Sequence, residues 1–268
     1  MNKQSPIGVI DSGVGGLTVL KCMMEHMPQE NLLYLGDTAR TPYGSRSREE
    51  IQSFVDEMIA WLVTQGVKQV VVACNTVTML GLENIKKNHD FDIVGMSKGE
   101  NTLLSLTKNK KIGVIATEFT IKSESHKKAI LAVDPTAEVI GVPCPKFVPL
   151  IEGEQFDSQE LKDAVNEYTS ILKKAGVDIM IMSCTHFPFV RDLLGQYLGA
   201  GVALVNPADE TCENARKNLQ SKNLVNDGAQ GSVTICCTAD LERVKRLAAR
   251  EIDIEKCTFK VVNLEDVK

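Results

Sequence analysis

Aromatic residues are scarce in this 268-residue chain, which has one Trp, four Tyr and eight Phe. A buried core must therefore rest on Val, Ile, Leu and Met. No apolar stretch approaches the roughly 20 residues of a membrane-spanning helix. The N-terminal stretch MNKQSPIGVIDSG also lacks the apolar segment of a signal peptide. We therefore expect a cytoplasmic protein without a membrane partner.

The sequence also lacks a long run of residues with the same charge. The chain has 30 Lys and Arg against 35 Asp and Glu, a net charge of −5, and no basic cluster. This argues against a nucleic-acid partner, although a small anionic substrate needs only a local site. The eight cysteines include no C-x-x-C pair and there are only four histidines, so a zinc cluster has little support. In a reducing compartment we expect no disulfide framework, and most cysteines should be small buried hydrophobes.

Short apolar runs bounded by turn residues predict buried strands. Between them lie longer stretches with helical periodicity, among them 47–65 and 157–175. This alternation predicts an α/β fold with mainly parallel sheets, in which the chemistry usually lies just past the carboxyl ends of strands. The expected strands are 7–10, 32–35, 70–73, 112–115, 139–142, 179–182 and 233–236.

The two halves of the chain repeat each other. The tetrapeptide IGVI occurs at 7–10 and 112–115, and each half has a later apolar run that ends in Cys, VVVACNT and IMIMSCTH. The same order at a similar offset predicts two similar α/β domains. A Gly-rich polar stretch at 95–101 suits one crossover, and a second is expected near Asn206-Pro207. The expected domains are therefore 1–97 with 207–268, and 98–206.

Two turn motifs follow strands of the first half. In DSGVGG at 11–16, glycines permit a tight turn whose N–H groups can hold an anion, but the pattern is not the dinucleotide fingerprint. Asp11 is either a proton relay or ammonium partner, or a helix cap. Pro42, Tyr43 and Gly44 form a turn with an aromatic tip and N–H groups, for which a plain surface turn is the favoured interpretation.

Two cysteines end apolar strands and are followed by polar side chains. Asn75 and Thr76 follow Cys74, and Thr185 and His186 follow Cys184. Taken singly, Cys74 is most simply a buried structural thiol, and Cys184 equally suits a protease-like nucleophile. His186 is close enough in sequence to tune the Cys184 thiol or relay its proton.

The pair of cysteines changes this interpretation. Two similar domains with facing strand ends would place the thiols on opposite sides of one cleft. One thiol could then remove a proton from one face of a carbon while the other delivers a proton to the opposite face. A thiol suits this task because its ordinary pKa, about 8.5, can be tuned towards neutrality. A redox pair would instead need the two sulfurs within bonding distance.

Four further residues are minor candidates. Glu152 could orient His186, although a loop carboxylate is more often solvated. His26, His89 and His126 lie in polar surroundings and show no evident partner in the sequence.

At these residues the sequence resembles the bacterial glutamate racemases within the aspartate/glutamate racemase family. The resemblance covers most of the chain, in family order. The matching stretches are IGVIDSGVGGLTVL at 7–20, YLGDTARTPYGSRS at 34–47, VVACNT at 71–76, IATEFTI at 115–121, CPKFVPLIEGE at 144–154 and CTHFP at 184–188.

The resemblance implies two pseudo-symmetric α/β domains with the active site at the domain interface. It implies interconversion of L- and D-glutamate for peptidoglycan synthesis, with no cofactor and no metal, and a possible homodimer. Cys74 would take the α-proton of the D-enantiomer and Cys184 that of the L-enantiomer, assisted by Asp11, His186 and Glu152. The implied substrate-binding residues are Asp11, Ser12, Pro42, Tyr43, Gly44, Asn75, Thr76, Thr117, Thr185 and His186.

The sequence departs from the family pattern at two places. The family commonly has Ile-Glu-Pro-Gly where this chain reads GMSKGE at 95–100, and Gly where it has Ser183. Neither departure removes a catalytic group. The alternatives are an aspartate or broad acidic amino-acid racemase, a single-thiol enzyme such as a decarboxylase, and a non-catalytic amino-acid-binding protein.

Overall fold

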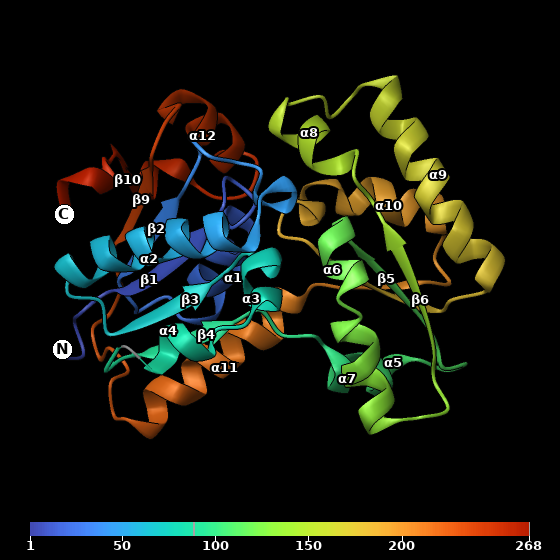
Figure 1. Ribbon diagram of the computed structural model, residues 1–268, viewed down its shortest axis with the longest axis horizontal. Coiled ribbons are helices and arrows are strands. Elements are labelled where there is room, and N and C mark those ends of the chain that lie inside the picture. The colour runs from blue at the N-terminus through green and yellow to red at the C-terminus, as the bar shows by residue number, and fades with distance from the viewer. Residues whose placement is uncertain (88, 268) are drawn as a thin grey trace. The chain divides into compact units, whose positions relative to one another are not determined.

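The computed structural model describes residues 1–87 and 89–267 (Figure 1). It divides into two compact units, 1–96 with 211–268, and 97–210. Every strand pairing in the described part is parallel, in two separate sheets. The predicted α/β fold with mainly parallel sheets is therefore confirmed. Among the described residues, no helix is both long enough and apolar enough to cross a membrane.

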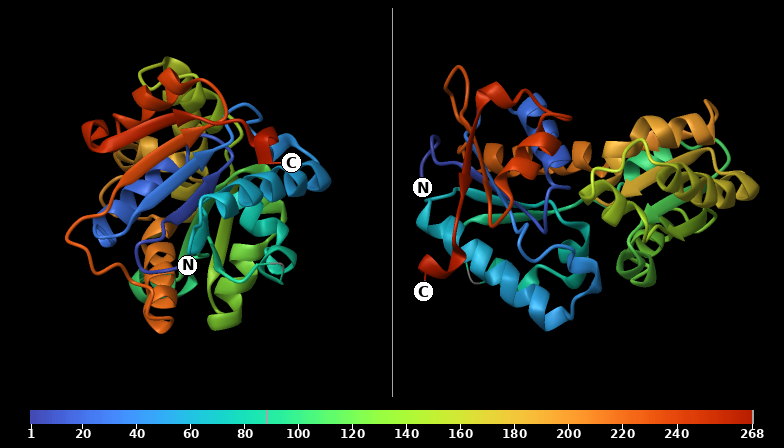
Figure 2. Two further views of the ribbon diagram at one scale, coloured as in Figure 1. Left: turned by 90° about the vertical axis from the view of Figure 1, so that its left-hand side faces the viewer. Right: turned by 90° about the horizontal axis from the view of Figure 1, so that it is seen from above.

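The first unit contains a six-stranded sheet with the order β10-β9-β2-β1-β3-β4. Its strands lie side by side in the left view of Figure 2, with β9 and β10 in orange and red beside the blue β1 and β2. The inner strands β1 and β2 are wholly buried, as expected for a parallel sheet covered on both faces. The strands are β1 (Ile7–Asp11), β2 (Leu32–Gly36), β3 (Gln69–Val72), β4 (Asp92–Gly95), β9 (Val233–Cys237) and β10 (Cys257–Val261).

Helix α2 (Arg48–Thr64) shows how local sequence sets an element of this unit. Ser47 caps the helix by accepting from the Glu50 N–H, and the Glu50 side chain accepts from the Ser47 N–H, a reciprocal capping box. Its apolar residues pack with the inward side chains of β1, β2 and β3 in one core. Helix α11 (Pro207–Ser221) contains the second crossover of the chain between the units. The other helical segments are α1 (Leu17–His26), η1 (Tyr43–Ser45), α3 (Asn75–Leu80), α4 (Glu83–Lys87), α12 (Leu241–Ala248), η3 (Ile254–Lys256) and η4 (Leu264–Val267).

The second unit contains a four-stranded sheet with the order β6-β5-β7-β8. Helix α9 (Gln159–Ala175) begins after Ser158, whose hydroxyl accepts from the Leu161 N–H, and ends at Gly176 in the left-handed conformation. The strands are β5 (Lys111–Ala116), β6 (Glu138–Pro143), β7 (Ile179–Ser183) and β8 (Ala203–Val205). The other helical segments are α5 (Glu100–Leu106), α6 (Glu118–Lys122), α7 (Ser125–Val133), α8 (Phe147–Glu152), η2 (Phe187–Val190) and α10 (Arg191–Leu198).

The inner strand β7 separates two cores. Met180 and Met182 pack with residues of α8 and α9, whereas Ile179 and Ile181 pack on the other face with residues of α5 and α7. Successive side chains of a strand point to opposite faces. The Cys184 side chain, just past the strand, belongs to the same core as Met180 and Met182.

All seven strands expected from the apolar runs are confirmed, and so are the two helices. Three further strands, β4, β8 and β10, were not expected. All three lie at sheet edges, and none is wholly buried. Polar residues interrupt β4 and β10, and β8 has only three residues, so no long apolar run marks these three strands.

Candidate active site

In the first unit, parallel strands bring two sequence-predicted groups to one edge of the sheet. Strand β1 pairs with β3, so the residues that follow them emerge side by side. The Cys74 thiol donates to the Ser12 hydroxyl, with Sγ and Oγ 3.7 Å apart. Both side chains are buried, at 5% and 7% exposure. A thiol and a hydroxyl therefore share this edge, where α/β sheets place reactive groups.

The turn after β1 is held by its own side chains. The Asp11 carboxylate accepts from the Gly13 N–H at 3.1 Å, and the Tyr34 hydroxyl donates to the Gly13 carbonyl at 2.6 Å. The N-cap of α1 is Gly16, which has no side-chain cap bond, so Asp11 fixes the turn rather than capping the helix. A Cβ at Gly16 would lie 2.6 Å from the Asp11 Cβ, and only glycine fits there.

Cys74 is also the N-cap residue of α3. Its carbonyl accepts from the Thr78 hydroxyl at 3.1 Å, and the Thr78 oxygen accepts in turn from the Met96 N–H. Asn75 and Thr76 form the first turn of the helix and are nearly fully buried. The backbone that carries the thiol is thus tied to the end of the neighbouring strand β4.

The turn at Pro42 to Gly44 differs from the expected surface turn with an aromatic tip. Tyr43 is 2% exposed, and its hydroxyl donates to the buried carboxylate of Asp37. Burial raises the Tyr43 pKa, and the charge of Asp37 adds to the effect. Arg40 donates to the same carboxylate oxygen at 2.7 Å. The expectation of an exposed aromatic tip is wrong because a buried charged acceptor draws the phenol inward, while Pro42 and Gly44 remain exposed.

In the second unit, three sequence-predicted residues meet in a chain of contacts. His186 Nδ1 lies 3.9 Å from Cys184 Sγ, and His186 Nε2 lies 2.7 Å from Glu152 Oε1. Cys184 is 6% exposed, and the His186 and Glu152 side chains are 4% and 11% exposed. Glu152 ends α8, so it is a partly buried helical residue rather than a solvated loop carboxylate.

Electrostatics favour a charged imidazole at this position. Burial by itself lowers the His186 pKa, but hydrogen bonds to Cys184 and Glu152 and their charges outweigh burial and raise the pKa well above its ordinary value. The raised pKa favours a protonated ring, which lies between a thiol and a carboxylate. A protonated ring at this place can donate a proton to the Cys184 sulfur.

The remaining predicted residues of this unit lie at the same sheet edge. Strand β5 pairs with β7, so Thr117, which follows β5, and Thr185, which follows Cys184, emerge from neighbouring strands. Thr117 is the N-cap residue of α6, and its hydroxyl lies 3.1 Å from the Thr120 hydroxyl. Thr185 is 5% exposed.

Three other cysteines are buried thiols. Burial raises the pKa of Cys144, and raises that of Cys236 to about 11. Cys237 is buried as well. Thiols of this kind stay protonated and inert at neutral pH, so they behave as the small buried hydrophobes that the sequence predicts.

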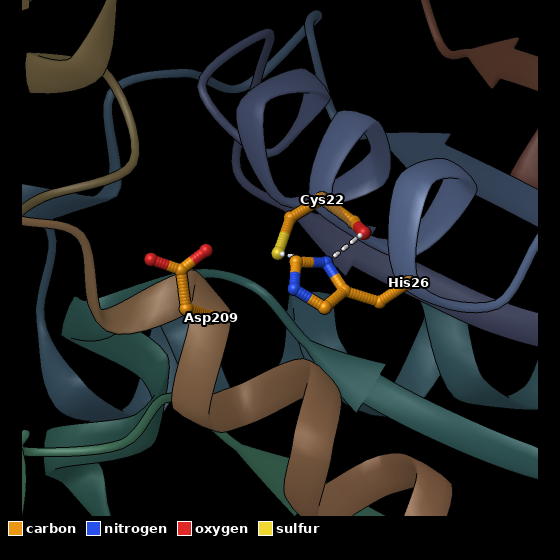
Figure 3. A group of neighbouring side chains, drawn as sticks. All are labelled: Cys22, His26 and Asp209. Carbon is orange, nitrogen blue, oxygen red and sulfur yellow. Dashed lines mark hydrogen bonds between the residues drawn. The ribbon is translucent and has the colours of Figure 1, made fainter.

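Two histidines without an evident partner in the sequence have one in the structure. His26 and Cys22 are one turn apart on α1, with His26 Nδ1 2.9 Å from the Cys22 carbonyl oxygen (Figure 3). His126 is 3% exposed, and its Nε2 lies 2.6 Å from the hydroxyl oxygen of Ser183. The expectation of polar surroundings is wrong for His126 because α7 turns this side chain onto the sheet. No sequence motif marks the pair, since 57 positions separate its members.

Comparison with known proteins identifies the family. The family model described as Asp/Glu/Hydantoin racemase matches residues 7–215. The chain belongs to this racemase family. It is 45% identical to the glutamate racemase of Enterococcus faecalis over 79% of this chain and 78% of the relative.

Two solved racemases share the fold over nearly the whole chain. One is glutamate racemase isoform RacE1 from Bacillus anthracis, with a TM-score of 0.90 and 33% identity over 98% of this chain and 99% of that one. The other is the glutamate racemase of Francisella tularensis in complex with D-glutamate, with a TM-score of 0.85 and 27% identity over the same shares. The family resemblance read from the motifs is confirmed.

Proposed function

We propose that this member of the racemase family interconverts L- and D-glutamate, with Cys74 and Cys184 as its two catalytic acid–base residues. The observation that carries the proposal is the Cys184–His186–Glu152 chain of contacts, which gives a thiol at a strand end a proton-holding partner. Cys74 follows the corresponding strand of the other unit, β3, and lies beside Ser12. The relatives named glutamate racemase support glutamate as the substrate.

The proposed reaction is a proton transfer through a planar carbanionic species. Starting from the L-enantiomer, the Cys184 thiolate takes the α-proton and the Cys74 thiol gives its own proton to the opposite face of the carbon. The reverse direction exchanges these roles. The His186 imidazolium faces the Cys184 sulfur, and Glu152 holds the ring in place and supports its charge.

The α-proton is only very weakly acidic, so the site must stabilise negative charge on the substrate. Fixed hydrogen-bond donors in a water-free cleft can do this without a cofactor. We propose that closure of the site around the bound substrate excludes water. The proposed substrate-binding residues are Asp11, Ser12, Pro42, Tyr43, Gly44, Asn75, Thr76, Thr117, Thr185 and His186.

In the direction from L- to D-glutamate, the proposed enzyme would supply D-glutamate for peptidoglycan synthesis. The Francisella tularensis relative was solved in complex with D-glutamate, which supports glutamate as the substrate. An aspartate or broad acidic racemase would use the same two thiols with a pocket of different length. Homodimer formation remains a prediction.

The deciding experiment follows proton exchange in D2O by NMR together with chiral analysis. L- and D-glutamate and L- and D-aspartate are each incubated with the wild type and with Cys74→Ser, Cys184→Ser and Cys144→Ala. We expect glutamate to invert with deuterium uptake at Cα, and either serine substitution to abolish turnover. The Cys144→Ala control should remain active, since Cys144 is buried and its pKa is raised.

Each other outcome would support one of the alternative functions or substrates. Inversion of aspartate alone would keep the chemistry and refute the substrate. Turnover that survives loss of one of the two cysteines would support a single-thiol enzyme. Binding of glutamate without exchange in any variant would support a non-catalytic amino-acid-binding protein.

A further inference from the structure

A buried hydrogen bond lies directly behind one of the two proposed catalytic thiols. Ser183 ends β7 and is fully buried, and its hydroxyl oxygen lies 2.6 Å from Nε2 of His126 on α7. Ser183 immediately precedes Cys184. The His126–Ser183 bond therefore holds the backbone of the residue that directly precedes Cys184, although the bond involves neither thiol.

The alternation of β7 separates this bond from the chemistry. Ile179 and Ile181 pack on the α7 face together with Ile130, which lies one helical turn beyond His126. Cys184 packs on the opposite face, in the core of α8 and α9. His126 thus contacts the strand from the side away from the Cys184 thiol, and it can act on that thiol only by holding the backbone.

His126 is a costly residue for a structural role alone. His126 is 3% exposed, and its Nδ1 has no hydrogen-bond partner in the part of the chain that the structure describes. A buried nitrogen left without a partner destabilises the folded chain, and an apolar side chain would avoid that cost. Burial, with a contribution from Lys98, lowers the His126 pKa to about 4, so the ring is neutral and keeps one proton for its two nitrogens.

Geometry makes the position of this strand end important. Cys184 must stay near His186, whose Nδ1 is 3.9 Å from the sulfur, and a shift of about 1 Å in a reacting group can cost on the order of 100-fold in rate. We propose that His126 and Ser183 form a positioning pair, which holds the carboxyl end of β7 so that the Cys184 thiol stays within reach of His186. The catalytic part of this inference rests on the proposed racemase function.

The test compares Ser183→Ala, His126→Phe and the double variant with the wild type. Each single variant removes the bond while nearly keeping the volume of the side chain. Thr169→Val is the matched control, because Thr169 is also buried in this unit and its hydroxyl donates to the Val165 carbonyl within α9. The control loses a buried hydroxyl bond but leaves β7 untouched.

Two readouts separate positioning from general destabilisation. The first is the alkylation rate of Cys184 by iodoacetamide at pH 7, measured by mass spectrometry relative to Cys74 in the same molecule. The second is the division of any loss in turnover between kcat and KM. We expect the relative alkylation rate of Cys184 to fall in both single variants, because the thiol moves away from the imidazolium. We also expect kcat to fall about tenfold with KM little changed.

The double variant should be no worse than either single variant, since all three lack the same bond. The proposal is overturned if the alkylation ratio and kcat match those of Thr169→Val, or if the losses of the two single variants multiply. If the wild type racemises neither amino acid, the proposed function fails. The alkylation ratio, measured without substrate, then still decides whether the pair positions Cys184.

Discussion

Glu152 lies 2.7 Å from Nε2 of His186, and this contact leaves the other ring nitrogen facing the sulfur of Cys184. The carboxylate and the thiol together raise the His186 pKa against the opposing effect of burial. One ring carbon, Cε1, joins the two nitrogens, so the carboxylate and the thiol each contact one nitrogen of the same imidazole. Glu152 thus affects the surroundings of Cys184 by raising the pKa of the His186 ring that contacts both residues.

The first prediction concerns this charge. Glu152→Gln keeps a hydrogen-bond acceptor for His186 but removes the negative charge, so the His186 pKa should fall. With a neutral imidazole, the Cys184 sulfur loses a positively charged neighbour. The alkylation of Cys184 should therefore slow relative to Cys74, and its pH profile should move to higher pH. An unchanged profile for Cys184 would show that Glu152 does not set the charge of His186.

The same group affects stability. A folded-state pKa above the unfolded value means that His186 contributes its full stabilisation below about pH 6.5, and that this contribution is lost as pH rises through the raised pKa. Urea unfolding between pH 6 and 9 should show a decline in the free energy of unfolding that is shallower in Glu152→Gln than in the wild type.

The second prediction concerns His126, whose contribution to stability depends on pH in the opposite direction. Its pKa is lowered to about 4, so the unfolded chain binds the proton more readily. The stability that depends on a neutral ring should be complete above pH 6.5 and should be lost as pH falls towards 4. The full effect is at most roughly 3 kcal/mol, at 1.36 kcal/mol per pKa unit.

Urea unfolding between pH 4 and 7 checks this. His126→Gln removes the titrating group and should flatten the decline at low pH, whereas Thr169→Val, which changes no titratable group, should keep the slope of the wild type. If His126→Gln keeps that slope as well, the titration of His126 makes no contribution to acid stability.

The third prediction concerns a buried ion pair in the first unit. Lys68 Nζ lies 2.6 Å from Glu30 and also donates to the carbonyls of Lys3 and Leu224, and both charged side chains are almost completely buried. Removing one partner leaves an uncompensated buried charge. Lys68→Met should therefore lower the free energy of unfolding by about 3–5 kcal/mol.

The double variant Glu30→Gln/Lys68→Met provides the control, because it leaves no unpaired charge. It should be more stable than Lys68→Met in the same urea titration. Equal stability of the two would mean that the loss comes from packing rather than from charge.

The fourth prediction concerns the turn that carries Pro42 and Gly44. Tyr43→Phe removes the hydroxyl that donates to Asp37, and a hydrogen bond to a charged group is worth about 1.5–3 kcal/mol. We expect a loss of stability in this range. If the backbone of the turn binds substrate, KM should also rise more than kcat falls.

Steady-state kinetics on glutamate, run beside urea unfolding, separates the two effects. Ser170→Ala, which removes an exposed hydroxyl bond within α9, should leave both quantities unchanged. A loss of stability with KM unchanged would restrict Tyr43 to a structural role.

The sequence by itself determined the fold class, the seven strands found by their apolar runs and the candidate thiols. Runs such as 70–73 and 179–182 are continuously apolar, and that pattern is a local property of the sequence. Strands β4 and β10 escaped because polar residues interrupt them, and β8 escaped because it has only three residues.

Tertiary structure decided what the polar side chains contact. Tyr43 turns inward to Asp37, and His126 reaches Ser183 across 57 positions of chain. Glu152 approaches His186 because α8 follows β6, two strands away from β7. Apolar periodicity is a property of neighbouring residues and can be read along the chain. The partners of a buried charge or hydroxyl depend on which distant segments the sheet order brings together, and only folding sets that order.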